Sequence, residues 1–212
     1  MSPNAIVFVI DDDPSVRKSL ARLLDAARYK TEVFKSASEF LVRSAYPGPS
    51  CVIVDVKMPG LDGIAMQEAL IKHGRNEQLV FITGHGDVPM CAQAMKAGAV
   101  DFLPKPFKPK QLLESVRRAL TRSTEQLLRE SERNDALALL QQLTPREYQV
   151  MELVATGLLN KQVGGKLGMA EKTVKTHRAH MMQKLRITSV AELMVVLQKA
   201  EVTPPVRPGT KV

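Results

Sequence analysis

The sequence predicts a doubly wound α/β domain over residues 1–120, a helical linker over residues 121–143 and an all-helical domain over residues 144–202. Three observations support this prediction. Short apolar runs alternate with helical patterns up to residue 120, as expected for a parallel sheet covered on both faces. Residues 121–143 have apolar residues at helical spacing without Pro or Gly, although a partly frayed connector is the alternative. The later segments are short helical patterns divided by glycines.

The first domain is expected to contain five strands and five helices. Capping signals mark several helix starts, such as Asp13 before a proline and Ser36 three residues before Glu39. The expected strands are 5–10, 31–34, 51–54, 79–83 and 100–103, and the expected helices are 15–27, 36–43, 63–73, 88–96 and one that begins at 109. Right-handed crossovers then restrict the order of these strands in the sheet.

Four helices are expected after the linker. Thr144 and Glu147 flank a proline in a capping-box pattern, and Ser189 with Glu192 repeats the pattern. The expected helices are 145–156, 161–167, 171–185 and one that begins at 189. Residues 203–212 contain three prolines and are expected to be a disordered tail.

The net charge of +8 is concentrated near the C-terminal end of the 212 residues. Residues 144–212 contain 11 basic and 5 acidic side chains and no Asp, whereas residues 1–120 have a net charge of only +3. This asymmetry predicts a polyanionic partner, such as double-stranded DNA, for the last domain alone.

The two cysteines match no metal-binding spacing and are expected to be reduced in a cytoplasmic protein. No signal peptide and no apolar run long enough to cross a bilayer is found, so no membrane partner is expected.

Acidic residues follow two of the predicted strands. Asp55 ends the most apolar run, and Asp11 and Asp12 follow the first strand, while Lys105 lies beyond the fifth. Because parallel strands present their carboxyl ends at one edge of the sheet, these side chains are expected to meet there. Carboxylates in this arrangement favour a site for a hard cation. The alternatives are a helix cap for the acidic run and a turn carboxylate for Asp55, and the combined spacing argues against both.

Helical spacing also sorts the residues of segment 171–185. Val174, Met181 and Leu185 form one apolar stripe. The residues that face away from this stripe are Lys172, Lys175, Thr176, Ala179 and Gln183. A helix with one apolar and one basic face fits the major groove of DNA. Arg178 lies near the edge of the stripe, so both a structural role and a DNA contact remain open.

Several segments resemble a known family. Ile-Thr-Gly-His-Gly-Asp-Val-Pro-Met at 82–90 and Met-Lys-Ala-Gly-Ala-Val-Asp-Phe at 95–102 resemble a two-component receiver domain, especially that of the FixJ branch. Leu-Thr-Pro-Arg-Glu at 143–147, Gly-Leu-Leu-Asn-Lys at 157–161 and Thr-Val-Lys-Thr-His-Arg at 173–178 resemble a LuxR-type helix-turn-helix. Residues 1–200 therefore resemble a response regulator of the NarL/FixJ family.

The resemblance implies a role for each residue at the predicted acidic site. The fold would be flavodoxin-like, with strand order 2-1-3-4-5. Asp55 would accept a phosphoryl group from a sensor histidine kinase, and Lys105 would be the family's invariant lysine. Mg²⁺ would be bound by Asp11, Asp12, Asp55 and the backbone carbonyl of Lys57.

The resemblance further implies a conformational switch in the first domain and a DNA-recognition helix at 171–185. Thr83 and Phe102 would be the switch pair, and the peptide bond before Pro106 would be cis. Lys175, Thr176 and Ala179 would contact bases, while Lys161 and Lys172 are expected at phosphates. Two features depart from the family pattern. Ala170 stands at a capping position, and two glycines, Gly164 and Gly165, lie within one helix.

The prediction is a phosphorylation-controlled DNA-binding transcription regulator that forms a homodimer when phosphorylated. It would be no enzyme beyond catalysing its own phosphoryl transfer and dephosphorylation. The alternative is a Mg²⁺-dependent phosphatase or phosphotransferase that uses an aspartyl phosphate. Such an enzyme requires a general acid, and Lys57 stands two residues after Asp55, where an acid would be needed. The alternative also leaves the basic C-terminal domain unexplained.

Overall fold

The computed structural model describes residues 4–84 and 88–203. The predicted tail, apart from its first residue, and part of the FixJ-like segment (85–87) lie outside these residues. The chain divides into two compact units, Met1–Leu127 and Leu128–Val212. Within the described ranges, none of the helices combines the length and the apolar character needed to cross a bilayer.

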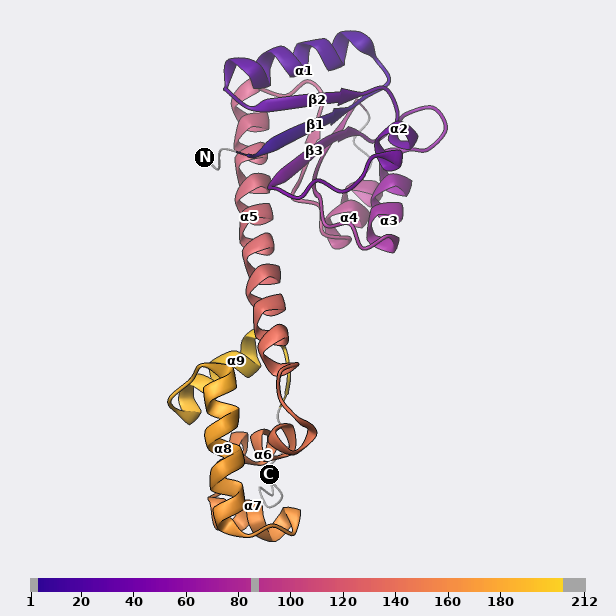
Figure 1. Cartoon of the computed structure of the whole chain (residues 1–212). Helices are drawn as coiled ribbons and strands as arrows, with labels where there is room; N and C mark the ends of the chain where they lie inside the picture. Colours follow the sequence, from indigo (N-terminus) through magenta and orange to yellow (C-terminus); the bar gives the residue numbers. More distant parts are fainter. Residues whose placement is uncertain (1–3, 85–87, 204–212) are drawn as a thin grey trace. The chain divides into compact units, whose positions relative to one another are not determined.

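The first unit is built on a five-stranded parallel sheet (Figure 1). The strands are β1 Ile6–Ile10, β2 Lys30–Phe34, β3 Ser50–Asp55, β4 Gln78–Thr83 and β5 Asp101–Pro104. Their order is β2-β1-β3-β4-β5, and every pair is parallel. The predicted flavodoxin-like fold is therefore confirmed.

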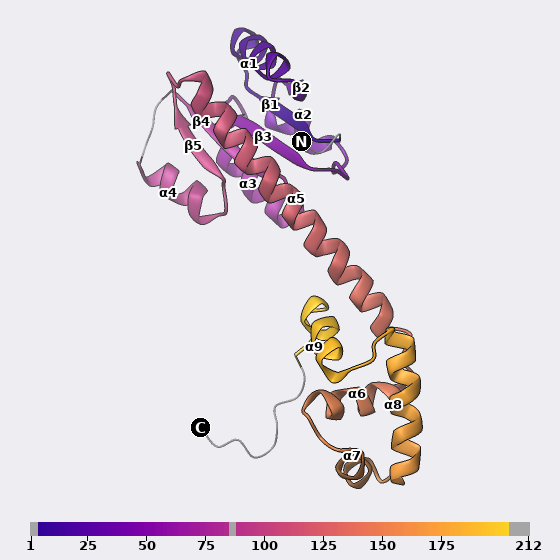
Figure 2. The same cartoon turned by 90° about the vertical axis from the view of Figure 1, so that its left-hand side faces the viewer.

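Helices cover both faces of this sheet (Figure 2). They are α1 Pro14–Ala26, α2 Ala37–Val42, α3 Gly63–Lys72, α4 Val88–Lys96 and α5 Pro109–Leu140. Alternate residues of β1, β3 and β4 enter separate cores, as Phe8 and Val9 do on β1. One core includes Phe40 of α2 and Met66 of α3, and the other includes residues of α1 and α5. Because both faces are covered, β1, β3 and β4 are apolar on both sides, whereas the edge strand β2 is mostly exposed.

Helix α5 extends through most of the predicted linker. Its 32 residues run without a break, since neither Pro nor Gly interrupts them after its first residue. Leu112 and Val116 near its start are buried in the first unit. Ala136 and Leu140 near its end are buried in the core of the second. The last helix of the α/β fold and the linker therefore form a single secondary-structure element.

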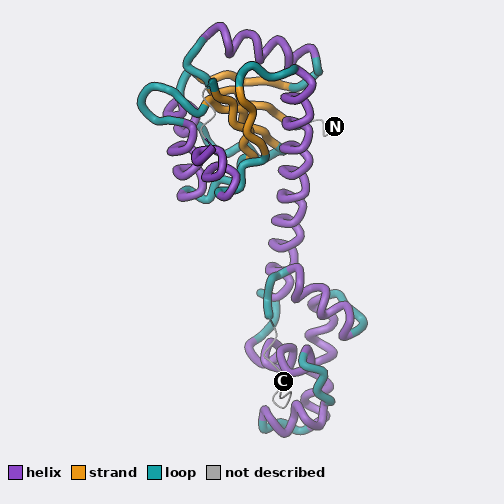
Figure 3. The backbone as a smooth tube through the Cα atoms, turned by 180° about the vertical axis from the view of Figure 1, so that it is seen from behind, coloured by secondary structure: helices purple, strands orange, loops and turns teal. Residues whose placement is uncertain are grey.

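Up to residue 203, where its described part ends, the second unit contains four further helices (Figure 3). They are α6 Pro145–Ala155, α7 Asn160–Leu167, α8 Glu171–Leu185 and α9 Val190–Lys199. The predicted capping box is present at α6: Glu147 N donates to Thr144 Oγ1 at 3.3 Å, and Thr144 N donates to Glu147 Oε2 at 2.8 Å. Gly168 ends α7 with a φ of 66°, a conformation that favours glycine.

Candidate functional site

Three carboxylates meet at the carboxyl-terminal edge of the sheet. Asp11 and Asp12 directly follow β1, and Asp55 is the last residue of β3, which lies beside β1. One oxygen from each of the three lies within 4.8 Å of the others. Asp11 is 1% exposed and Asp55 9%, whereas Asp12 is open to solvent. The strand-end carboxylates predicted from the sequence are therefore brought together.

Lys105 connects two of these carboxylates. Its Nζ lies 2.9 Å from Asp11 Oδ2 and 2.7 Å from Asp55 Oδ2. Burial alone would lower the pKa of the Lys105 ammonium, but the hydrogen bonds that the ammonium donates to Asp55 and Asp11, together with their negative charges, outweigh burial and raise it. The lysine is therefore a permanent positive charge beside Asp55. The Lys105–Pro106 peptide bond is cis, as the family resemblance implied.

Asp11 accepts hydrogen bonds from Lys105 and Asp13, but the charged form of its carboxyl is still disfavoured. Burial raises the pKa of its carboxyl, and the negative charge of Asp55 adds to this effect. Lys105 and the backbone N–H of Asp13, which donates to Asp11 Oδ1 at 2.9 Å, act in the opposite direction. Asp13 itself caps α1, because its Oδ1 accepts from Ser15 N at 2.7 Å.

The close approach of α3 helps to fix the end of β3. A Cβ at Gly63 would lie 2.5 Å from the backbone oxygen of Asp55, so a larger residue could not start the helix here without displacing the strand end. The Lys57 N–H donates to Asp55 Oδ1 at 3.2 Å. The backbone around Asp55 is therefore set by packing as well as by hydrogen bonds.

The two expected switch residues lie on neighbouring strands. Thr83 ends β4 and is fully buried, and Phe102 is partly buried on β5. Phe102 stands opposite Phe81 in the β4–β5 register, and their ring centroids are 6.1 Å apart. Lys105 N donates to Thr83 O, so the backbone at Thr83 is tied to the lysine at the carboxylate cluster.

The donor set fits a small, hard divalent cation. Three carboxylates facing one lysine leave an excess of negative charge, which is unfavourable unless another cation offsets it. Mg²⁺ prefers oxygen ligands and is commonly bound through one or two carboxylates, with water and phosphate oxygens completing the shell. The residues present therefore match the requirements of a magnesium site.

In the second unit, α8 separates an apolar from a polar face. Val174, Met181 and Leu185 are buried, as predicted. The opposite face is exposed and contains every residue of this helix that was expected at DNA: Lys172, Lys175, Thr176 and Ala179. Lys161 is exposed at the second position of α7. This arrangement leaves a basic helix face free to enter a groove.

The two departures from the family pattern are visible in the structure. Ala170 is the N-cap of α8 and makes no side-chain capping bond. At Gly164 a Cβ would lie 2.6 Å from the backbone oxygen of Met169, so close backbone packing explains this glycine. At Gly165 a Cβ would meet nothing within 4 Å, and nothing in the structure explains it.

Two family profiles match the chain. The profile described as response regulator receiver domain matches residues 7–117, which include the carboxylate cluster. The profile described as bacterial regulatory proteins, luxR family, matches residues 141–197, which include α6 to α9. The chain belongs to the NarL/FixJ family of response regulators.

Relatives of this response regulator align along most of its length. Nodulation protein W of Bradyrhizobium diazoefficiens is 46% identical over 195 residues, which cover 91% of this chain and 85% of that protein. The transcriptional regulatory protein FixJ of Azorhizobium caulinodans is 39% identical over 198 residues, which cover 93% of this chain and 94% of that protein. The low-resolution structure of response regulator StyR matches with a TM-score of 0.81 and 44% identity, and the match covers 92% of this chain and 98% of StyR. Receiver and DNA-binding domains thus occur in one chain, as in transcription regulators of two-component systems.

Two side chains near the sites of this response regulator were not among the predicted residues. Arg17 on α1 donates through Nη1 to the backbone oxygen of Asp11 at 2.6 Å. No sequence signal distinguishes it from an ordinary helix-surface arginine. His180 is exposed on α8, one turn after Thr176 and on the same face. The helical spacing of α8 is the signal that identifies His180 as a candidate DNA contact.

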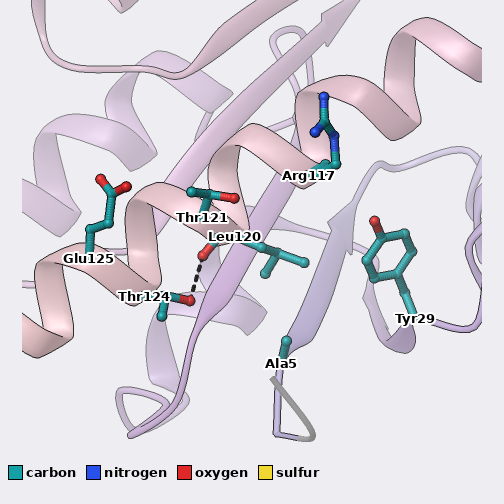
Figure 4. A pocket seen from close by; sticks show the side chains of 7 residues that line it. All are labelled: Ala5, Tyr29, Arg117, Leu120, Thr121, Thr124 and Glu125. Atoms are coloured by element: carbon teal, nitrogen blue, oxygen red, sulfur yellow. Dashed lines mark hydrogen bonds between the residues drawn. The ribbon is translucent and has the colours of Figure 1, made fainter. Parts of the chain in front are cut away.

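A pocket in the receiver of this response regulator lies away from the carboxylates (Figure 4). It has a volume of about 410 Å³ and is lined by Ala5, Tyr29, Arg117, Leu120, Thr121, Thr124 and Glu125. Ala5 and Tyr29 directly precede β1 and β2, so the pocket is at the amino-terminal edge of the sheet. Asp55 lies at the opposite, carboxyl-terminal edge, so the pocket is not part of the carboxylate site.

Proposed function

We propose that Asp55 is the phosphoryl acceptor of this regulator and that a sensor histidine kinase is the donor. The observation that supports this most is the contact of Lys105 Nζ with both Asp11 and Asp55 at the carboxyl edge of the sheet. In the reaction, an Asp55 oxygen forms the new bond to phosphorus and the bond from phosphorus to the donor histidine nitrogen breaks. Lys105 stabilises the charge on the transferring group. The chain would catalyse its own phosphorylation and dephosphorylation in this way.

Mg²⁺ is the cofactor that we infer for this reaction. Asp11, Asp12 and Asp55 would hold it, and the backbone carbonyl of Lys57 is proposed as a further ligand. When bound, the ion neutralises negative charge on the phosphoryl group. The match of residues 141–197 to a DNA-binding family favours a regulator over the alternative of a phosphatase.

The donor would reach Asp55 across the α1 side of the receiver. A groove of about 470 Å³ borders Lys105 and is lined by apolar residues of α1 and of the segment after β5. Val16, Leu23 and Phe107 are among them. Their partial exposure next to the acceptor supports docking of the kinase at this groove.

The output would be control of transcription. Phosphate oxygens on Asp55 would accept a hydrogen bond from the Thr83 hydroxyl, and Phe102 would fill the vacated space. On the DNA-binding unit, Lys175, Thr176 and Ala179 would read bases while Lys161 and Lys172 contact phosphates. Since a bacterial chromosome lies in the cytoplasm, this is where the regulator would act.

Phosphorylation would favour a homodimer through α4 and the neighbouring part of β5. Val88 is 80% exposed and Met95 43% exposed on α4, so this helix presents apolar surface. Helix-turn-helix dimers bind paired half-sites, and pairing of receivers raises the effective concentration of the second DNA-binding unit.

Replacement of Asp55 tests the acceptor. Incubation of the chain with Mg²⁺ and a small phosphodonor should add one base-labile phosphate, and Asp55→Asn should abolish that mass increase. Asp13→Asn is the matched control, because asparagine still caps α1 and the variant should be labelled normally. Asp12→Ala should weaken Mg²⁺ binding without unfolding the chain. Undiminished labelling of Asp55→Asn would exclude it as the acceptor.

Two lysine variants test the DNA contacts. Lys175→Ala should weaken binding to a selected duplex by about 1–3 kcal/mol and reduce discrimination against other sequences. Lys161→Ala should weaken binding to all sequences alike and lower the salt slope of the binding constant by about one. Fluorescence anisotropy over a salt series measures both quantities. Equal losses on selected and random DNA for Lys175→Ala would exclude base reading by this lysine.

A further inference from the structure

A side-chain contact joins the two helices that are expected to meet DNA. Asn160 is the first residue of α7, and Arg178 lies one turn beyond Val174 on α8. Arg178 Nη1 donates to Asn160 Oδ1 at 3.1 Å. Arg178 is half-buried, whereas Lys175 and Thr176 on the same helix are exposed. The guanidinium is therefore directed toward α7 rather than along the open face of α8.

Few side-chain hydrogen bonds fix the first turn of α7, although Val163 in this turn is buried in the core. It is only 8 residues long, and its N-cap, Leu159, has no side-chain acceptor. Gln162 Oε1 accepts from Leu159 N at 2.9 Å, which makes one half of a capping box. A helix of this length is marginal by itself, so its position depends on packing against neighbours.

The other half of α7 is fixed by its backbone. The approach of Gly164 to the Met169 carbonyl holds that part of the helix against the turn before α8. A Cβ at Gly164 would lie 3.6 Å from Val174 Cγ2, so this contact is also near the start of α8. Besides the buried Val163, these two contacts help to define how α7 lies on α8, and the Arg178–Asn160 hydrogen bond is the one farther from the turn before α8.

We propose that Arg178 is a positioning residue for DNA recognition, which acts through Asn160 to fix the distance between Lys161 and Lys175. The proposal rests on the proposed function, in which Lys161 contacts phosphate and Lys175 reads bases. Lys161 follows Asn160 directly in α7, so a shift of the first turn moves this ammonium relative to α8. A DNA backbone and a base edge are fixed relative to each other, so both contacts form together only at one spacing.

The test uses the full chain, activated with beryllofluoride, and two duplexes. One duplex is selected from a random pool by the wild-type chain, and the other is a scrambled sequence of the same composition. The variants are Arg178→Ala, Asn160→Ala and the double variant. Lys166→Ala is the charge control, because it removes an exposed cation from α7 and leaves the hydrogen bond intact. Binding is measured over a salt series, and each variant is melted to record its stability.

If Arg178 is a positioning residue, each single variant should lose about tenfold in affinity for the selected duplex, as expected for a hydrogen bond to a charged group. The double variant should lose no more than the singles, since both remove the same contact. The scrambled duplex should be bound almost as before, and the salt slope of Asn160→Ala should be unchanged, because asparagine carries no charge. Selectivity is the decisive quantity, because a merely structural role would lower the melting temperature and leave selectivity intact.

Other results would overturn the proposal. Suppose that Arg178→Ala instead weakens binding to both duplexes alike and lowers the salt slope by about one, while Asn160→Ala has no effect. In that case Arg178 is a phosphate contact. Additive losses in the double variant would also contradict a shared contact. If Asn160→Ala loses helix content, Asn160→Ser replaces it, since serine keeps a polar side chain at this position but its acceptor is shorter. Lys175→Ala in the same series separates the positioning role from the proposed function. If Lys175→Ala does not reduce selectivity, base reading by Lys175 is wrong. If only the Asn160 variants bind both duplexes as the wild type does, the positioning role alone is overturned.

Discussion

Glu147 links two helices of the DNA-binding unit through a carboxylate that is 3% exposed. Its Oε2 accepts from Thr144 N at 2.8 Å and from Lys184 Nζ at 2.6 Å. Burial alone would raise the pKa of this carboxyl, but the Lys184 ammonium and the donors of Thr144 outweigh burial and hold the pKa below its ordinary value of 4.5. The last turn of α8 is therefore tied to the first turn of α6.

The lowered pKa of Glu147 predicts a pH-dependent stability. Its contribution is fully present above the unfolded-state pKa near 4.5 and is lost as the pH falls through the lower folded-state pKa. Glu147→Gln keeps the cap but removes the charge, so it should reduce the free energy of unfolding at neutral pH by about 1 kcal/mol. Wild type and variant should become equally stable in acid. Hydrogen exchange of residues 144–155 in urea measures this difference.

Glu192→Gln is the control for this experiment. Glu192 occupies the same capping-box position on α9, and its partners are Thr188 and Ser189 rather than a lysine. Its replacement should change the stability less than that of Glu147. If the free energies of unfolding of wild type and Glu147→Gln still differ in acid, the ion-pair explanation is contradicted.

At this scale the sequence predicts which residues matter better than it predicts their contacts. Asp11, Asp55 and Lys105 could be selected because each follows an apolar run, and parallel strands end at one edge. The contact of Lys105 with Asp11 spans 94 positions, and that of Lys184 with Glu147 spans 37. No local pattern encodes such distances. Arg17 was missed for the same reason, because its role depends on where the Asp11 carbonyl lies in space.

Helix α7 shows how two adjacent glycines can differ. Gly164 is buried against the Met169 carbonyl, whereas Gly165 is exposed with open space where a side chain would project. Glycine in a helix loses more backbone freedom on folding than alanine does. The first glycine is therefore required by packing, and the second only lowers the stability of the helix.

Alanine substitutions at these two positions should have opposite effects. Gly165→Ala should raise the free energy of unfolding of the DNA-binding unit by about 0.5–1 kcal/mol, because it lowers the entropy of the unfolded chain. Gly164→Ala should lower it by roughly 1–3 kcal/mol, because the new Cβ displaces backbone at Met169. Each variant serves as the control for the other in thermal melts. Destabilisation by both would mean that Gly165 has a structural role.

The elements themselves were largely predictable. Strand and helix bounds agree within a few residues, because apolar runs and capping residues mark them locally. Helix α5 was the exception in one respect: two predicted segments form one element of 32 residues. Periodicity alone cannot reveal that its two ends serve different cores, since Val116 and Leu140 are buried by residues distant in sequence.

The whole molecule contains two units that each have a core of their own. Strand residues such as Phe8 and Val9 belong to the cores of the receiver, and Val150 and Met181 belong to that of the DNA-binding unit. The proposed phosphoryl acceptor, Asp55, and the proposed DNA-recognition helix, α8, thus belong to separate units. Control by self-association needs no altered contact between them, because pairing of receivers suffices to bring two DNA-binding units together.

Sedimentation tests this mode of control. The untreated chain should be mainly monomeric at low micromolar concentration, and beryllofluoride should convert it to a dimer that binds paired half-sites more tightly. Val88→Asp, which introduces a charge on α4, should prevent the dimer, while Val42→Asp at an equally exposed site on α2 should not. An unchanged mass together with unchanged DNA affinity would exclude dimerisation as the switch. A stable dimer before treatment would indicate rearrangement within a preformed pair.

The different surroundings of the two cysteines make the natural chain suitable for selective labelling. Cys51 in β3 has no exposed surface, and burial raises the pKa of its thiol far above the ordinary range, so it should resist alkylation. Cys91 on α4 is partly exposed, and the sequence contains no third cysteine. A maleimide dye therefore has one accessible attachment point, on the helix proposed to form the interface. Energy transfer between donor- and acceptor-labelled chains could then follow receiver pairing in real time without an engineered cysteine.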